Sequence, residues 1–313
     1  MTEARFRVIA TGPHVSVQDA GRFGQMRFGV PASGPMDRTA HAIANRAVAR
    51  PPEAAGIEVS RGGLVLECLS GAVSLAVTGG GFIVESGEAR AGSWVRTTIR
   101  AGQRLTIRPG HWGSWAYLAF AGALVSPHWL GHAATHSMSG LGGGKLTVGQ
   151  EILVTGARLL GDEAKIPCPV FARPLHRVHV VMGPQDRFFD SATQARFLHE
   201  PFSLTDAYDR MGVRLKGPPL MPVGALSIPS EPILRGSVQV AGDGVATILL
   251  ADHQTTGGYP KIATILSADL DRLVQLRPRD RLRFCAVSAA EAVARARLHA
   301  ARIRPYFSAI GPR

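Results

Sequence analysis

The sequence predicts a mainly β protein with a few helices, arranged as two β domains. Short apolar or alternating runs recur along the chain, each bounded by Gly, Pro, Asp or Ser. Helical patterns are few, so barrels or sandwiches are favoured over a doubly wound sheet. With 313 residues, 45% of them hydrophobic, the chain is long enough for two ordinary domains or one large β domain.

The expected elements follow from these patterns in chain order. The expected strands include residues 6–10, 64–68, 73–78, 105–108, 116–120, 177–182, 237–240 and 245–250. Three stretches carry helical patterns instead, namely 37–48, which opens at Asp37 as an N-cap, 190–198, and the Ala/Arg-rich stretch 289–303.

A weak internal similarity between three segments bears on the domain organisation. Residues 101–107, 148–154 and 278–284 each place a turn before an alternating strand. Recurring turn chemistry and true duplication both explain this pattern. Duplication would give two related β domains that meet within the polar, Pro-containing segment 155–174. We expect an N-terminal β domain at 1–155, a C-terminal β domain at 175–290, and a C-terminal helix and tail at 291–313.

The charge balance favours small anionic substrates over nucleic acid. The formal net charge is +12, and only four of the basic residues are lysines, Lys145, Lys165, Lys216 and Lys261. The arginines are scattered, and no basic run alternates with aromatic residues as it would in a nucleic-acid groove. We therefore expect a small-molecule substrate and no nucleic-acid partner.

Cysteine usage and hydropathy indicate a cytoplasmic protein without a metal site. Cys68, Cys168 and Cys285 are far apart and form no CxxC pair, so neither a disulfide framework nor a zinc site is expected. The N-terminus lacks a signal-peptide pattern, and no apolar stretch approaches the roughly 20 residues that span a bilayer. No membrane partner is expected.

The segment 251–261, ADHQTTGGYPK, concentrates chemistry between two apolar runs. Two hydroxyls, two adjacent glycines, a phenol and an ammonium lie where one strand ends and the next element begins. Loops on a rigid scaffold are common places for sites. Adjacent glycines cost backbone entropy that a purely structural strand end does not require.

Two further regions carry similar polar motifs. Two other segments resemble nucleotide-binding and zinc-binding motifs but lack required residues. The first region is 15–37, with VQDAGRFG and SGPMD, and the second is 208–240, with DRMGVRLKGPPL and SEPILRGSVQ. Residues 140–146 look like a phosphate loop but miss the P-loop spacing, and Leu146 replaces the required hydroxyl. His132 and His136 have zinc-ligand spacing without the supporting glutamate.

These motifs resemble those of the biotin-dependent carboxyltransferase subunits. That family includes the C subunit of bacterial ATP-dependent 5-oxoprolinase, the second half of the urea carboxylase carboxyltransferase domain, proteins known as allophanate hydrolase subunit 2, and the antagonist of the sporulation kinase inhibitor. The similarity runs from about Val8 to Ser288 through VQDxGRxG, SGxMD, DRMGxRLxGPPL, SEPxxxGxxQ and DxQTTGGYPKIA.

The resemblance implies cyclophilin-like β-barrels and a heteromeric enzyme. A kinase-inhibitor-like B subunit would complete the active site, and a lactonase-like A subunit would take part in opening 5-oxoproline to glutamate with ATP. ATP would be used by the complex, at a site not located in this chain. In the carboxyltransferase members, carboxybiotin on a separate carrier protein is the donor.

The candidate site residues fall into two groups by the chemistry that they offer. Charge-assisted donors, hydroxyls and amides suit the oxygens of a lactam, a carboxylate or a urea-like amide. The candidate catalytic residues are Asp252, Thr256, Tyr259 and Lys261. The candidate substrate-binding residues are Gln18, Asp19, Arg22, Arg210, Arg214, Gln239, Thr255, Gly257 and Gly258.

Structural roles compete with several of these functions. Asp19 and Arg22 would pair across a turn, Asp37 would only cap a helix, and residues 210–214 would hold a hairpin together. Tyr259 is either a proton donor or a wall of the site.

The first half of the chain departs from the family pattern. Leu130-Gly131-His132-Ala133-Ala134-Thr135 stands where relatives have LGSRST, Trp115 replaces an arginine before the YLA strand, and 78–81 reads TGGG. These changes remove two positive groups and a potential acid, which leaves the substrate open.

Three functions remain for this chain. It is a subunit of a 5-oxoprolinase that is inactive alone, a carboxyltransferase subunit that moves a carboxyl group from carboxybiotin to a urea-like amide, or a non-catalytic binding partner of a kinase-inhibitor-like subunit.

Overall fold

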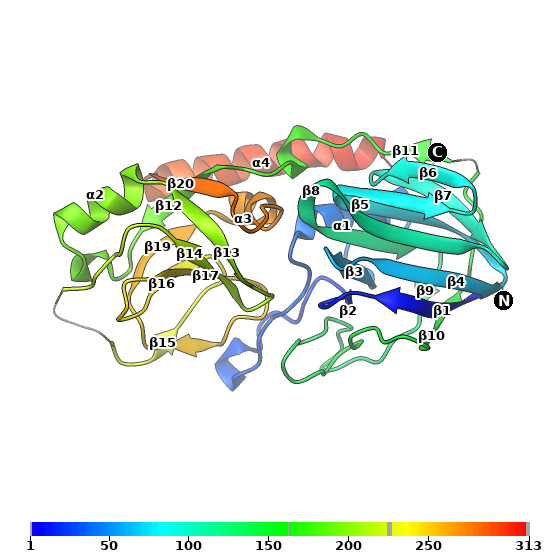
Figure 1. The fold of residues 1–313 in the computed structure, drawn as a ribbon, viewed down its shortest axis with the longest axis horizontal. Helices are drawn as coiled ribbons and strands as arrows, with labels where there is room; N and C mark the ends of the chain where they lie inside the picture. Colours follow the sequence, from blue (N-terminus) through cyan, green and yellow to red (C-terminus); the bar gives the residue numbers. More distant parts are fainter. Residues whose placement is uncertain (1, 162, 224–226, 311–313) are drawn as a thin grey trace. The chain divides into compact units, whose positions relative to one another are not determined.

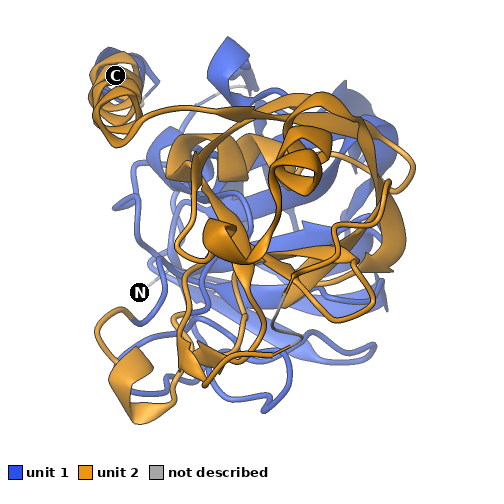
Figure 2. Ribbon diagram, turned by 90° about the vertical axis from the view of Figure 1, so that its left-hand side faces the viewer, with its two compact units in different colours: residues 1–22, 33–173, 304–313 blue, residues 23–32, 174–303 orange. Residues whose placement is uncertain are grey.

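The computed structural model describes residues 2–161, 163–223 and 227–310 and divides the chain into two compact units (Figure 2). The first unit comprises residues 1–22, 33–173 and 304–313, and the second comprises 23–32 and 174–303. Each unit is built mainly of β-strands (Figure 1), which confirms the predicted fold class.

The first unit is one large sheet ordered β11-β7-β5-β8-β4-β1-β10-β9, in which β6 pairs with β5, and β3 pairs with both β2 and β8. Its strands are β1 (Glu3–Thr11), β2 (Ser16–Gln18), β3 (Gly56–Ser60), β4 (Leu64–Ser70), β5 (Ala72–Ser86), β6 (Ala89–Gly92), β7 (Val95–Arg100), β8 (Arg104–Phe120), β9 (Ala123–Leu124), β10 (Glu151–Thr155) and β11 (Ala164–Lys165). In β1, Ala4, Phe6 and Val8 are fully buried and alternate with exposed neighbours, because successive side chains point to opposite faces of a sheet.

Helix α1 (Arg38–Ala47) packs against β5 and β8 in this unit. The side chain of Asp37 accepts a 2.8 Å hydrogen bond from the backbone N–H of Ala40, so the predicted N-cap is confirmed. Ile43, Ala44 and Ala47 bury the apolar face of the helix. A short 3-10 helix, η2 (Val170–Ala172), follows near the end of the unit.

The second unit contains a closed barrel in the order β12-β19-β16-β17-β14-β13-β20. Its strands are β12 (Arg177–Met182), β13 (Phe202–Tyr208), β14 (Gly212–Lys216), β16 (Ser237–Val240), β17 (Ala246–Leu249), β19 (Lys261–Ile265) and β20 (Arg281–Ala286), and a separate ribbon pairs β15 (Glu231–Pro232) with β18 (Thr256–Gly257). The β12–β20 pair is parallel, whereas the other pairs of the barrel are antiparallel. Val238, Val240 and Ile248 are completely buried in the unit.

Three helices and two 3-10 turns accompany the second unit within its described residues. They are η1 (Met26–Phe28), η3 (Asp186–Phe188), α2 (Ser191–His199), α3 (Ser267–Leu273) and α4 (Ala289–Ala309), the last of which continues into residues of the first unit. The helix predicted at 190–198 is present as α2, and Asp190 caps it, since its carboxylate accepts from Thr193 N at 2.7 Å. Among the described helices, none is both long and apolar enough to cross a bilayer.

Two details of the predicted elements are wrong. The runs 105–108 and 116–120 belong to one strand, β8, which continues through Pro109 and Gly110 with register shifts against β5. Helix α3 was not predicted. Its N-cap residue, Leu266, makes no side-chain capping hydrogen bond, so the usual start signal is missing.

The aromatic cluster beneath α2 is expected to dominate the stability of the barrel. Phe197 is fully buried and stacks on Phe284, with ring centroids 4.3 Å apart. Truncating Phe197→Ala should lower the free energy of unfolding by about 3–5 kcal/mol, because the packing contacts are lost and a cavity remains. Chemical denaturation followed by circular dichroism measures this loss. The control Phe23→Ala, at a side chain that is 65% exposed, should change stability by less than about 0.5 kcal/mol.

Candidate functional site

Lys261, the first residue of β19, has a buried ammonium group at the ribbon of β15 and β18. Its side chain is 2% exposed, and Nζ donates to Oε1 of Glu231, the first residue of β15, at 2.5 Å. The Glu231 side chain is 39% exposed, so this pair joins a buried charge to one that reaches solvent. Among the described residues, Glu231 is the one acceptor of the Lys261 ammonium, which has three donors. Two N–H donors therefore remain for a ligand oxygen.

Gln185 fixes this pair from a third segment. Its Nε2 donates to Glu231 Oε1 at 2.5 Å, and its Oε1 accepts from the backbone N–H of Lys261 at 3.1 Å. Its own backbone N–H donates to the carbonyl of Lys261 at 3.1 Å. Hydrogen bonds from the Lys261 ammonium and then from the Gln185 amide hold the pKa of the Glu231 carboxyl below its ordinary value. The Glu231 carboxylate is consequently charged at neutral pH.

Gly257 allows the ribbon to lie close to the barrel. A Cβ at this position would lie 2.7 Å from Nε2 of Gln239, which is 5% exposed. The Gln239 amide donates to the carbonyl of Tyr259 at 3.4 Å. The close approach to Gln239 gives Gly257 a structural role, although the sequence suggested that a purely structural strand end does not require glycine here.

A row of residues across four strands places three predicted site residues on one face. Lys261 pairs with Gln239, Gln239 with Thr247, and Thr247 with Arg214. Residues that pair across strands project to the same face, and neighbouring strands are about 4.8 Å apart. Arg214 thus lies about 14 Å from Lys261 along the sheet. Exposure rises along the row, from the buried Lys261 to the exposed Arg214.

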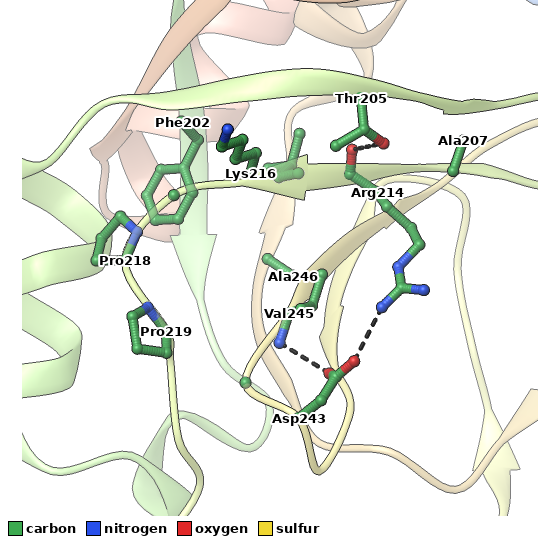
Figure 3. A pocket seen from close by; sticks show the side chains of 13 residues that line it. Phe202, Thr205, Ala207, Arg214, Lys216, Pro218, Pro219, Asp243, Val245 and Ala246 are labelled. Carbon is green, nitrogen blue, oxygen red and sulfur yellow. Dashed lines mark hydrogen bonds and ion pairs between the residues drawn. The ribbon is translucent and has the colours of Figure 1, made fainter.

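Arg214 lies at a separate pocket of about 430 Å³ (Figure 3). Its guanidinium donates to Asp243 Oδ2 at 2.9 Å, and both side chains are about half exposed. Phe202, Pro218 and Pro219 also line this pocket. Arg214 and Lys261 therefore lie at opposite ends of one cross-strand row, and the structure does not bring their charged groups together.

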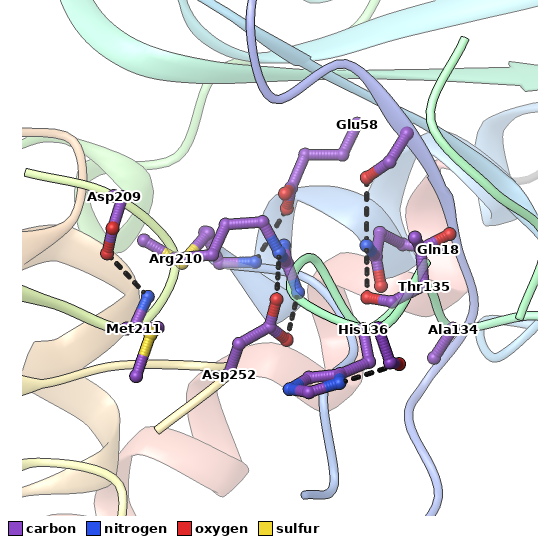
Figure 4. A network of polar contacts seen from close by, with 12 residues as sticks. Gln18, Glu58, Ala134, Thr135, His136, Asp209, Arg210, Met211 and Asp252 are labelled. Carbon is purple, nitrogen blue, oxygen red and sulfur yellow. Dashed lines mark hydrogen bonds and ion pairs between the residues drawn. The ribbon is translucent and has the colours of Figure 1, made fainter. Parts of the chain in front are cut away.

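Arg210 and Asp252 form a buried bidentate ion pair (Figure 4). Nε and a terminal nitrogen of Arg210 each donate to a different carboxylate oxygen of Asp252 at 3.0 Å, and the side chains are 1% and 0% exposed. The backbone N–H of Asp252 also donates to the carbonyl of Arg210 at 2.8 Å. This pair attaches the start of the glycine-rich loop to the turn before β14. The complete burial of both charges makes this bidentate contact costly to break.

The rest of the loop is partly open to solvent. Thr256 is exposed, Thr255 and Gly258 are half-buried, and Tyr259 is 46% exposed. His253 is buried, which lowers the pKa of its imidazole and favours the neutral form. The arrangement offers hydroxyl and backbone groups beside a fixed ammonium and carboxylate, which can bind a carbonyl or carboxylate oxygen.

The predicted residues of the first unit form a second polar group. Gln18 is fully buried, and its Nε2 donates to Ser16 Oγ at 2.9 Å and to the carbonyl of Thr135 at 3.2 Å (Figure 4). Arg22 is fully buried, donates to the carbonyl of Ala134, and lies 4.5 Å from the centre of the Trp129 ring.

Asp19 does not pair with Arg22 across the turn. Its two carboxylate oxygens accept from the backbone N–H groups of Gly21 at 2.9 Å and Ala133 at 2.7 Å, and His132 Nδ1 lies 3.5 Å away. The segment 130–135, which departs from the family pattern, is therefore held by Asp19, Arg22 and Gln18 through its backbone. Because these hydrogen bonds are made to backbone atoms of the segment, changes of its side chains leave them in place.

A buried network around Glu58 was missed from the sequence. Tyr117 donates to Glu58 Oε2 at 2.9 Å, and the backbone N–H of Met36 donates to the same oxygen at 2.7 Å. The backbone N–H of Asp37 donates to the Tyr117 hydroxyl at 2.6 Å. Burial, with the nearby Glu58 and Asp37 carboxylates, raises the pKa of Tyr117 well above its usual range. His41 is also fully buried, which lowers its pKa to about 4.

Glu231 and Gln185 are the site residues that sequence reasoning omitted in the second unit. Glu231 belongs to the SEPxxxGxxQ motif, so a signal was present, whereas Gln185 stands in no motif. Within the described part of the chain, no group of three or more His, Cys, Asp or Glu is placed to hold a metal ion.

Comparisons with known proteins bear on the whole length of the chain. Residues 28–286 match the family described as "Carboxyltransferase domain, subdomain A and B". The chain is 31% identical to the C subunit of 5-oxoprolinase from Escherichia coli strain K12 over 299 residues, which cover 92% of this chain and 93% of that protein. It is 30% identical to a putative urea carboxylase of Emericella nidulans, over 91% of this chain but 24% of that protein.

A solved structure shares the fold. The crystal structure of Kluyveromyces lactis urea carboxylase superposes with a TM-score of 0.87 at 24% identity. The superposition covers 99% of this chain and 30% of that chain.

Protonation of Glu231 should weaken the site only in acid. Because the folded pKa lies below the ordinary value of 4.5, the Lys261–Glu231 attraction is complete above pH 4.5 and is lost as the pH falls through the lower folded pKa. Glu231→Gln should be less stable than the wild type at pH 7, and the two should converge only once the pH has fallen below the folded pKa of Glu231. Urea denaturation at a series of pH values checks this. A constant difference down to the most acidic pH would contradict the ion pair.

His41 should make the first unit sensitive to mild acid. The unfolded state binds a proton near pH 6.5, whereas the folded imidazole stays neutral to about pH 4. Folding is therefore penalised progressively as the pH falls through this window, by about 3 kcal/mol in total. Tryptophan fluorescence reports on this unit, because Trp94, Trp112, Trp115 and Trp129 all lie in it. The wild type should lose this stability relative to His41→Gln, and parallel pH profiles would contradict the prediction.

Proposed function

Because this chain belongs to the carboxyltransferase domain family with subdomains A and B, we propose that it is a subunit of an ATP-dependent 5-oxoprolinase, inactive alone. The observation that supports this proposal is the share of each chain that the match covers. The match with the C subunit of a 5-oxoprolinase extends over almost the full length of both chains, whereas the chain corresponds to a quarter of the urea carboxylase relative. The complex would open the ring of 5-oxoproline to give glutamate.

The ammonium of Lys261 is the group that we assign to the chemistry. Cleavage of a lactam or of a phosphorylated intermediate builds negative charge on an oxygen atom, and a fixed cation in a poorly hydrated site stabilises that charge. Glu231 orients the ammonium through a 2.5 Å hydrogen bond, and Gln185 holds Glu231 in place through another of the same length. The hydroxyl of Thr256 and the backbone at Gly257 and Gly258 would bind the substrate carboxylate beside it.

The remaining predicted residues take supporting roles in this proposal. Asp252, whose carboxylate oxygens both accept from Arg210, would position the loop rather than transfer a proton. Gln239 would hold the backbone at Tyr259, and the half-exposed Tyr259 phenol would form a wall of the site. Arg214 would contribute long-range positive charge from its place in the cross-strand row. Gln18, Asp19 and Arg22 would shape the first-unit loop.

Two other subunits complete this enzyme in our proposal. A kinase-inhibitor-like B subunit would close the site, and a lactonase-like A subunit would handle 5-oxoproline together with ATP. No residue of this chain is assigned to ATP. We place the complex in the cytoplasm, with no membrane and no nucleic-acid partner.

The family description and the urea carboxylase relative favour one alternative, a carboxyltransferase subunit. In that reaction the same ammonium would bind an oxygen of the carboxyl group carried by carboxybiotin on a separate protein, or of a urea-like acceptor. A labelled carboxyl group on a biotinylated carrier distinguishes the two functions. Its transfer to an acceptor would support the alternative, and its retention would count against it.

Lys261→Met in the assembled complex should reduce ATP-dependent release of glutamate from 5-oxoproline at least about 100-fold, mainly in kcat, because a donor to the developing charge is lost. The control Lys216→Met removes an equal charge from an exposed position of β14 and should leave the rate within about twofold of wild type. Glutamate is measured after the chain is co-purified with its two partners.

Two results would contradict this proposal. Absence of ATP-dependent glutamate release from the wild-type complex would exclude the oxoprolinase function. Full activity after Asp252→Asn, Thr256→Ala and Lys261→Met would instead indicate a non-catalytic partner of the kinase-inhibitor-like subunit.

A further inference from the structure

The first unit contains a pocket of about 810 Å³ that the proposed reaction does not use. Its lining residues come from β5, β6, β7, β8 and β11, from the turn between β6 and β7, and from the segments on either side of β11, all within this unit. The volume is in the range of pockets that hold small organic ligands. Aromatic and basic side chains share the lining, so the pocket offers both apolar surface and positive charge.

The floor of the pocket depends on a bulged ribbon between β5 and β8. The pairing shifts register on both sides of Gly81, and a Cβ there would lie 2.4 Å from Nε1 of Trp112. A Cβ at Gly110 would lie 1.9 Å from the Gly81 carbonyl oxygen. Bulges re-aim side chains, and glycine within a strand allows a close approach. Gly81, within the segment that departs from the family's usual TGA pattern, thus leaves room for the Trp112 indole that lines the pocket.

A second aromatic residue of the pocket has an unusual backbone. Trp94 has φ of +71°, in the left-handed region that bulky residues rarely adopt. Backbone hydrogen bonds hold it there, from Trp94 N to Val77 O at 2.6 Å and from Ile166 N to Trp94 O at 2.7 Å. Its indole Nε1 donates to the carbonyl of Gly79 at 2.6 Å. Such strain persists where the surroundings fix it, commonly at ligand sites.

The charged side chains of the lining are mostly positive. Arg90, Lys165 and Arg173 outnumber the carboxylate of Glu163, and His111 adds a further donor. Arg90 lies 3.7 Å from Glu85, which partly offsets its charge. Within the described residues, the Lys165 ammonium and the Trp112 indole N–H have no hydrogen-bond acceptor. Both donors are therefore available to a bound anion.

We propose that this pocket binds a small anion that carries a planar ring, with the ring against the half-buried Trp112 indole and the anionic group at Lys165. Two features select this ligand class. The Trp112 indole favours a flat apolar body, and the unpartnered Lys165 ammonium and indole N–H favour acceptor oxygens. The site is distinct from the Lys261 cluster, because all of its lining residues belong to the first unit.

Fluorescence titration of the full chain with 8-anilinonaphthalene-1-sulfonate, an aromatic anion, tests the proposal. One saturable site is expected. Lys165→Glu should weaken binding about tenfold or more, since a charged hydrogen-bond partner becomes a like charge. Lys145→Glu makes the same charge change at an exposed position of the same unit and should leave the affinity unchanged. Lys216→Glu, at the pocket of the second unit, should also have no effect.

Competition distinguishes the parts of the ligand. Benzoate and phenyl phosphate should displace the probe at concentrations at least about tenfold lower than acetate and inorganic phosphate, which lack the ring. Trp112→Ala should abolish this advantage of the ring, and its unfolding curve shows whether it folds. Lys165→Glu, at an exposed position, provides the test if Trp112→Ala does not fold. Absence of saturable binding, an equal loss with Lys145→Glu, or equal competition by acetate and benzoate would overturn the proposal.

Discussion

Burial of the Lys261 ammonium is the constraint that shapes the candidate site. A cation that is 2% exposed has lost most of its hydration, and that loss must be offset by a counter-charge and by hydrogen bonds. Glu231 supplies the charge from β15, and Gln185 supplies an amide that contacts both partners. Three segments distant in the sequence are thereby fixed around one nitrogen atom, with two of its donors left for a ligand.

The neighbouring features follow from keeping the ribbon close to this cation. Gly257 is required because any side chain would meet the amide of Gln239. The Arg210–Asp252 pair fixes the beginning of the same loop, and its complete burial makes it a rigid anchor. Tyr259 and Thr256, by contrast, remain exposed. The loop thus has two fixed points, with adaptable polar groups between them.

Local sequence patterns were enough to predict most of the fold, whereas the site depends on contacts between residues that are distant in the sequence. The cap at Asp37 was predicted, because the capping bond lies three residues away, and the cap at Asp190 has the same local spacing. Strand β8 was predicted as two strands, since Pro109 and Gly110 look like a turn unless the facing bulge of β5 is known. Lys261 was predicted as a site residue, whereas its partner Glu231 lies 30 residues away and Gln185 lies 76 residues away. No local pattern reports contacts at such separations.

A double-mutant cycle between Lys261→Met and Glu231→Gln measures how far the buried ammonium depends on its carboxylate. Free energies of unfolding are measured at pH 7 for the wild type, both single variants and the double variant. If the carboxylate compensates the buried ammonium, Glu231→Gln should destabilise the wild type, yet cost roughly 1–3 kcal/mol less once Lys261 is methionine. Additive losses, with a coupling energy near zero, would show that the two charges do not depend on each other and would contradict the role assigned to Glu231.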